Sequence, residues 1–147
     1  MMKPITPISG SDVFVVNDKN EVLLILRADN NYWSLPGGCQ ELGETPANCA
    51  IRECKEETGF EVEITDLLGT WSSMSYEFIN YPHKDNEYCH LMFKADIIGG
   101  ERTLSSESLD VAWFSEDNLP EISDGHDIRI KFGFDWINKK ITKPYFE

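Results

Sequence analysis

Apolar residues recur along the chain in short runs and at helical spacing, and the two patterns predict different elements. Apolar runs at 12–17 and 21–27 flank the polar turn "DKN", an arrangement typical of a β-hairpin. The polar and aromatic segment 72–86 predicts a loop. Longer runs rich in β-branched and aromatic residues predict three further strands, at 60–71, 87–99 and 109–115.

A helix is predicted between Thr45 and Gly59. Thr45 is a favoured N-terminal cap, Pro46 suits the first helical position, and Gly59 is a typical helix stop. Between them, small and apolar residues recur every three or four positions, at Ala47, Ala50, Ile51, Cys54 and Thr58. A second amphipathic helix is predicted over 127–141. Strands combined with two well-separated helices predict an α/β sandwich, with one helix on each face of a sheet.

Length and charge narrow the classes of protein to consider. A chain of 147 residues suits one domain, so we expect 1–147 to form a single unit. The formal net charge of −13 disfavours binding to a nucleic-acid polymer, which attracts basic surfaces. A small anionic substrate is still compatible with this charge if metal ions provide positive charge locally.

The sequence also predicts where the protein resides. Residues 1–10 have no apolar core and include Pro4, and the apolar runs are too short to span a bilayer, so we expect neither a signal peptide nor membrane association. The four cysteines form no CxxC pair and suit reduced thiols in the cytoplasm: Cys39, Cys49, Cys54 and Cys89. The three histidines are too scattered to predict a zinc site: His83, His90 and His126.

The segment 38–60, "GCQELGETPANCAIRECKEETGF", concentrates negative charge on one side of the first predicted helix. Glu56 and Glu57 lie three and four positions after Glu53 and repel it, with Arg52 and Lys55 as nearby basic residues. By charge pattern alone this is an ordinary solvated helix face. However, the preceding glycine-rich stretch permits close approach of a ligand. Clustered carboxylates beside such a loop are typical of sites for hard cations such as Mg²⁺.

This segment resembles the Nudix signature GX5EX7REUXEEXGU at every fixed position. Cys54 stands where the family usually has a larger aliphatic residue, and we expect slightly looser packing there. The first predicted hairpin, "WSLPGG" and "AWFSEDNLPE" also resemble Nudix hydrolases, so the resemblance covers roughly 10–121. It implies the Nudix fold, an α/β/α sandwich with a mixed β-sheet between helices. The fixed positions of the signature are Gly38, Glu44, Arg52, Glu53, Glu56, Glu57 and Gly59.

The resemblance implies a Mg²⁺-dependent hydrolase that cleaves a pyrophosphate bond in a nucleoside di- or triphosphate derivative by metal-activated water. Glu53, Glu56 and Glu57 would be catalytic metal ligands, with the Gly38 carbonyl as a further ligand. Mn²⁺ is an alternative to Mg²⁺, since both suit oxygen ligands.

The same resemblance assigns supporting roles within the signature. Arg52 and Glu44 would form an ion pair that holds the glutamates in place, which makes Arg52 part of the catalytic apparatus. An ordinary surface pair is the alternative for these two residues. Gly59 would be structural, at the end of the helix.

Further candidates lie outside the signature. Some similar enzymes carry a catalytic glutamate six residues before a tryptophan, which corresponds here to Glu107 and Trp113, with Glu101 as a rival. Similar enzymes often bind substrate phosphate with an arginine at the position of Arg27, although a surface ion pair is the alternative. Several aromatic residues are candidates to stack on a base, with core packing as the alternative: Trp33, Tyr76, Phe78 and Tyr81.

The resemblance leaves the substrate open among nucleoside triphosphates, oxidised nucleotides and ADP-ribose-like compounds. Tyr76 occupies a position associated with dinucleoside polyphosphate hydrolases, so that activity is an alternative. A nucleotide-sensing module without catalysis is another, and an RNA-end pyrophosphohydrolase is a third that the acidity disfavours. Similar proteins often pair, so a homodimer that uses the tail 141–147 is also to be considered.

Overall fold

The computed structural model describes residues 6–81 and 86–147, so Pro4 and His83, used in the sequence analysis, lie outside the described residues. Its elements in chain order are β1 (Ile8–Phe14), β2 (Val22–Arg27), β3 (Trp33–Ser34), β4 (Gly37–Cys39), α1 (Pro46–Thr58), β5 (Phe60–Ser72), the 3₁₀ turn η1 (Ser73–Ser75), β6 (Tyr88–Gly100), β7 (Ser108–Phe114), the 3₁₀ turn η2 (Glu116–Asn118) and α2 (His126–Ile137).

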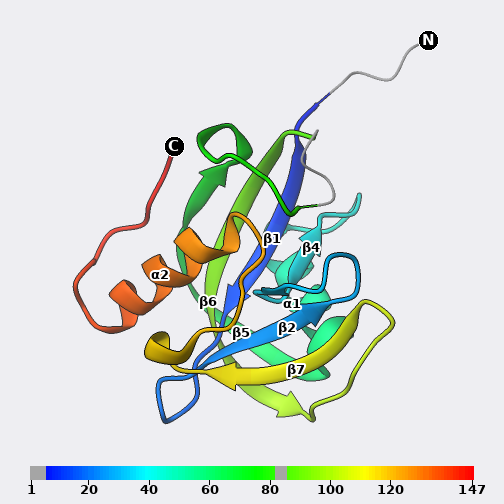
Figure 1. Ribbon diagram of the computed structural model, residues 1–147, viewed down its shortest axis with the longest axis vertical. Helices are drawn as coiled ribbons and strands as arrows, with labels where there is room; N and C mark the ends of the chain where they lie inside the picture. The colour runs from blue at the N-terminus through cyan, green and yellow to red at the C-terminus, as the bar shows by residue number, and fades with distance from the viewer. Residues whose placement is uncertain (1–5, 82–85) are drawn as a thin grey trace.

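The strands form two sheets, and the two helices lie on opposite sides of them (Figure 1). The four-stranded sheet has the order β4-β1-β6-β5 and is mixed, because β1 and β6 run parallel while the other pairs are antiparallel. The three-stranded sheet has the order β3-β2-β7 and is antiparallel. The predicted α/β/α sandwich is therefore confirmed.

Side chains of the central strands point alternately to the two faces of the sheets, and they form two hydrophobic cores, one under each helix. On β1, Val13 packs in the core beneath α1, while the next residue, Phe14, packs in the core beneath α2. On β2, Leu23 and Leu24 divide in the same way. Successive strand side chains point to opposite faces, so continuous apolar runs serve both helices at once.

The predicted hairpin between the first two strands is confirmed only at its turn. Val16 and Val22 form an isolated antiparallel bridge, and the Leu23 N–H donates to the Val15 carbonyl (2.9 Å). Beyond this point the strands separate, since β1 pairs with β4 and β6 while β2 pairs with β3 and β7. The prediction was wrong about pairing because distant strands compete with the local partner for the same backbone groups. The separation leaves β1 and β2 on two sides of a cleft.

The second helix is shorter than predicted, since α2 ends at Ile137 and not at 141. Lys139 has a positive φ of 59°, which is incompatible with continued helix. After this turn, the Tyr145 carbonyl accepts from the Thr70 N–H (2.9 Å), and the Tyr145 N–H donates to Leu68 O (3.0 Å). The tail thus pairs with β5 of its own chain, and a homodimer stays a prediction. Neither helix in the described residues is long and apolar enough to cross a membrane.

Candidate active site

Helix α1 begins and ends where its sequence predicts, and this sets the direction of its glutamates. The Thr45 hydroxyl accepts from the Asn48 N–H (3.1 Å), and Gly59 adopts φ 83°, a left-handed conformation that favours glycine. Cys49, Ala50 and Cys54 are fully buried. These small side chains allow α1 to lie close to the sheet.

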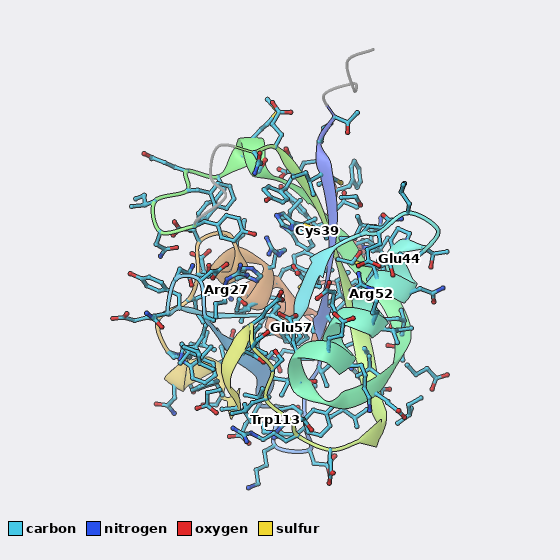
Figure 2. The ribbon with its side chains drawn as sticks, turned by 90° about the vertical axis from the view of Figure 1, so that its right-hand side faces the viewer. Arg27, Cys39, Glu44, Arg52, Glu57 and Trp113 are labelled. Atoms are coloured by element: carbon cyan, nitrogen blue, oxygen red, sulfur yellow. The ribbon has the colours of Figure 1, made fainter. Side chains whose placement is uncertain are left out.

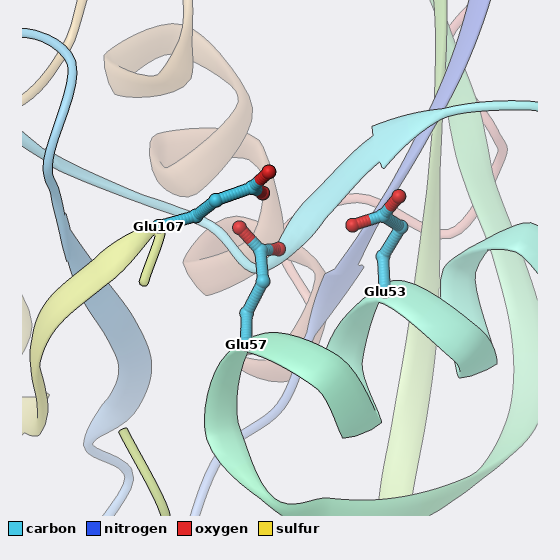
Figure 3. A group of neighbouring side chains, drawn as sticks. All are labelled: Glu53, Glu57 and Glu107. Carbon is cyan, nitrogen blue, oxygen red and sulfur yellow. The ribbon is translucent and has the colours of Figure 1, made fainter. Parts of the chain in front are cut away.

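Three carboxylates converge at this helix (Figure 3). Glu53 and Glu57 project from the same side of α1, one turn apart, and Glu107 reaches toward them from the turn before β7. One oxygen from each carboxylate lies within 4.8 Å of the others. The structure therefore brings together two residues of the signature and the candidate from outside it.

Burial makes this cluster electrostatically unfavourable on its own. Glu57 is only 6% exposed, and burial raises its pKa well above the usual range. Repulsion from Glu53 and Glu107 raises this pKa further. The Gly37 N–H, which donates to Glu57 Oε1 (2.7 Å), acts in the opposite direction. Burial also raises the pKa of Glu53, against the effect of Arg52. Convergent carboxylate oxygens are the donor set that Mg²⁺ prefers, so these residues fit a divalent cation.

Glu56 lies apart from this cluster and faces Arg52. Its side chain is 58% exposed, and its Oε2 lies 3.2 Å from Arg52 Nη1. The predicted pair of Arg52 with Glu44 is present as a two-pronged contact, with Nη2 to Oε1 at 2.7 Å and Nε to Oε2 at 2.9 Å (Figure 2). This contact lowers the pKa of Glu44 to about 2. Because Arg52 Nη1 also contacts Glu53 (2.8 Å), the pair orients one carboxylate of the cluster.

Gly38 lies directly beside Glu53. A Cβ at this position would lie 2.5 Å from Glu53 Cδ, so a larger residue would displace the Glu53 carboxylate from its place in the cluster. The Gly38 carbonyl accepts a long hydrogen bond from the Cys49 thiol (3.5 Å). Its predicted role as a metal ligand stays a prediction.

The carboxylates line one part of a cleft with a volume of about 760 Å³. Arg27 lines the same cleft, and its charge acts on Glu57. Its guanidinium contacts Asp29 (2.6 Å) and lies over the ring of Tyr81, 5.2 Å from the centroid. The cleft therefore combines a carboxylate cluster that fits a divalent cation with an arginine, the side chain best suited to phosphate oxygens.

Most of the aromatic candidates lie elsewhere. Trp33 packs in the core beneath α2 against Phe114, with ring centroids 4.8 Å apart. The Tyr76 hydroxyl donates to Asp127 Oδ2 (3.1 Å), and Phe78 packs against Tyr76 at 5.2 Å. None of the three lines the cleft, which disagrees with the expectation that they stack on a base.

Among the described residues, the rings that line the cleft are Tyr81, Tyr88, His90 and His126. Tyr88 and His90 are stacked, with centroids 5.2 Å apart and planes inclined by 12°. Both lie on β6, and the sequence analysis had assigned neither to a site. Their alternate spacing on a predicted strand was the available signal, since residues two apart share a face.

The sequence analysis also missed a polar group at the inner end of the cleft. Arg129 and Asp12 are almost fully buried and form an ion pair at 2.9 Å. His126 accepts the Leu35 N–H at Nδ1 (3.2 Å), and burial together with the charge of Arg129 lowers its pKa well below the usual value. An aspartate at the start of an apolar run was the only sequence signal for this group.

Comparisons with known proteins agree with this geometry. A model of the NUDIX domain family matches residues 7–133. A "MutT-like protein" from Streptomyces ambofaciens is 36% identical over 118 residues, 80% of this chain and 70% of that protein. An "ADP-ribose pyrophosphatase" from Methanocaldococcus jannaschii is 33% identical over 129 residues, 84% of this chain and 72% of that protein.

Solved structures show the same fold. A UDP-X diphosphatase superposes with a TM-score of 0.86 at 22% identity, over 99% of this chain and 70% of that one. An ADP-ribose pyrophosphatase from Streptococcus suis gives a TM-score of 0.81 at 22% identity, over 97% of this chain and all of the other. At these identities the likeness concerns the fold alone.

Proposed function

Because the chain belongs to the Nudix family of hydrolases, which act on phosphorus-containing anhydrides, we propose that it cleaves a pyrophosphate bond in a nucleoside di- or triphosphate derivative in the presence of Mg²⁺. The observation that carries this proposal is the convergence of Glu53, Glu57 and Glu107 in the same cleft as Arg27.

Free thiols at all four cysteines suit a cytoplasmic protein.

In this proposal the three carboxylates hold the cation, with Mn²⁺ as an alternative and the Gly38 carbonyl and Glu56 as further candidate ligands. When bound, the cation neutralises charge on the diphosphate and activates water. Arg52 keeps Glu53 oriented through their 2.8 Å contact. Glu44 in turn holds Arg52, so the two act on the reaction through the carboxylates that Arg52 contacts, Glu53 and Glu56.

The remaining residues of the cleft bind and orient the substrate. Arg27 contacts the phosphate oxygens that the carboxylates repel. Water attacks one phosphorus, the bridging P–O bond breaks, and one carboxylate of the cluster accepts the proton of the water. Tyr88 and His90 provide ring surfaces for the nucleoside. A volume of about 760 Å³ is in the range of sites for ligands of this size.

ADP-ribose-like compounds are the first substrates to test, because a relative at 33% identity carries the name ADP-ribose pyrophosphatase. Oxidised nucleotides come next, because a relative from Bacillus subtilis at 31% identity is named a putative 8-oxo-dGTP diphosphatase. Dinucleoside polyphosphates rank lower, because Tyr76, the residue associated with them, lies outside the cleft.

The test is hydrolysis across a panel of nucleotides with Mg²⁺, analysed by the products formed. The panel contains ADP-ribose, nucleotide sugars, canonical and oxidised nucleoside triphosphates, and diadenosine polyphosphates, with Glu57→Gln as the matched control. A substrate cleaved by the wild type and not by the variant supports the proposal, and its products identify the broken bond. Nucleotide binding without cleavage of any compound would replace hydrolysis with a sensing function.

A further inference from the structure

One buried hydroxyl joins the elements that carry the carboxylates. Ser108, the first residue of β7, is fully buried, and its Oγ donates to the Glu57 carbonyl at the end of α1 (2.7 Å). The same oxygen lies 2.7 Å from Ser105 Oγ. A serine hydroxyl has one hydrogen, which Ser108 uses on Glu57, so Ser105 is the donor between the two serines.

The hydrogen bonds continue from Ser105 to Glu107. Ser105 Oγ accepts from the Glu107 N–H (3.3 Å) and from the Ser108 N–H (3.2 Å). The turn that carries Glu107 is thereby closed on itself and attached to the helix end that carries Glu57. The Glu107 side chain is exposed, so this attachment of its backbone sets the region that its carboxylate can reach.

The backbone around Ser108 also pairs with the strand that carries Arg27. The two residues are directly opposite each other in the β2–β7 pairing, next to an irregularity in that pairing. The Glu107 carbonyl accepts from the Ala28 N–H (3.1 Å). Ser108 therefore lies where three elements meet: the end of α1, the turn that carries Glu107, and strand β2, which carries Arg27.

We infer that Ser108 is a positioning residue, whose hydroxyl sets the separation of the Glu57 and Glu107 carboxylates and so tunes the affinity of the centre for its cation. The inference rests on the proposed function, because that function assigns the cation to these carboxylates. Ser108 touches neither substrate nor cation, and it acts through the backbone of both glutamates. The purely structural reading is that the hydroxyl only satisfies a terminal helix carbonyl.

The experiment compares Ser108→Ala with Ser34→Ala. Ser34 is a matched control, because it is also fully buried in a strand and its hydroxyl has no hydrogen-bond partner within residues 6–81 and 86–147. Mn²⁺ binding to each protein without nucleotide is measured by calorimetry, and folding is checked by thermal unfolding. Ser108→Ala is expected to weaken Mn²⁺ binding about tenfold or more, the usual effect of losing a group that orients a metal ligand. Ser34→Ala is expected to bind Mn²⁺ as the wild type does.

A second variant covers the case in which Ser108→Ala does not fold. Ser105→Ala removes the partly exposed hydroxyl that holds the Glu107 N–H, and it is expected to weaken Mn²⁺ binding by a smaller factor. Hydrogen exchange at the Glu107 amide should rise in both variants. A folded Ser108→Ala that binds Mn²⁺ with wild-type affinity would overturn the inference, even if its unfolding temperature fell.

Measuring Mn²⁺ without nucleotide separates this inference from the proposed function. Weakened Mn²⁺ binding in Ser108→Ala, in a protein that cleaves no nucleotide of the panel, would keep the positioning role and end the hydrolase proposal. If the wild type cleaves a nucleotide and Ser108→Ala binds Mn²⁺ with the same affinity as the wild type, the hydrolase proposal is kept and the positioning role of Ser108 is rejected.

Discussion

Within residues 6–81 and 86–147, buried charged side chains occur both beneath α2 and on α1, and these two regions differ in what provides the opposite charge. Beneath α2, Arg129 faces Asp12 at 2.9 Å, so the protein neutralises its own charge. At α1, Glu53, Glu57 and Glu107 converge with like charge. A buried charge is costly unless it is paired. The comparison indicates that the first region stabilises the fold, while the second is arranged for a cation from solution.

Removing the positive partner beneath α2 should have the largest effect on stability. Arg129→Met leaves Asp12 buried without its counter-charge and is expected to lower the free energy of unfolding by about 3–5 kcal/mol. Urea unfolding measures the loss. The matched control is Arg102→Met, which breaks the half-exposed pair with Asp110 and should lose no more than about 1 kcal/mol. Equal losses in the two variants would mean that burial does not distinguish the pairs.

Removing a charge at α1 should do the opposite, and affect activity instead of the fold. Glu57→Gln keeps an acceptor for the Gly37 N–H and relieves repulsion from Glu53 and Glu107. Stability without metal is expected to be equal to the wild type or higher, while the rate falls about 10²-fold or more. Steady-state kinetics and urea unfolding of the same preparations test both parts. A variant with a near-normal rate would remove Glu57 from the metal site.

Low pH should decrease the free energy of unfolding, because the folded protein keeps the buried His90 neutral. Burial, together with the charges of Arg129 and Arg27, lowers the pKa of His90 from 6.5 to about 3. Below pH 6.5 the unfolded chain therefore binds a proton that the folded protein does not. Stability falls with decreasing pH, by about 2 kcal/mol for this histidine between pH 7 and 5.

The contribution of His90 is isolated by comparison with His90→Gln. The difference in unfolding free energy between wild type and variant should change across this pH window, because only the wild type has the titrating group. A constant difference from pH 7 to 5 would show that His90 titrates equally in the folded and unfolded chains.

The smallest effect is expected at the exposed end of the carboxylate cluster. Glu107→Gln should lower the rate about tenfold, because Glu107 is the most accessible of the three and its loss leaves the partly buried Glu53 and the buried Glu57 in place. Glu101→Gln is the control, since Glu101 does not line the cleft. A larger loss in Glu101→Gln than in Glu107→Gln would transfer the role to Glu101.

The two regions also differ in how far they could be predicted from the sequence. The α1 region was predictable because helix caps, helical periodicity and the Nudix signature are all local, and a helix places residues four apart on the same side. The region beneath α2 was not, because Asp12 and Arg129 are far apart in sequence and neither belongs to a local pattern. Three of the four aromatic candidates, Trp33, Tyr76 and Phe78, lie outside the cleft for a related reason, since an aromatic residue suits a core as well as a cleft.

The sequence by itself determined the family, both helices, the long strands and the glutamates of α1, because these depend on residues within a few positions of one another. Only the tertiary structure decided that Glu107 meets Glu53 and Glu57, and that Glu56 turns toward Arg52. It also decided that β1 and β2 separate into two sheets with a cleft between them. These outcomes depend on which distant strands pair and how closely the helices pack against them. Both depend on contacts between residues far apart in the chain.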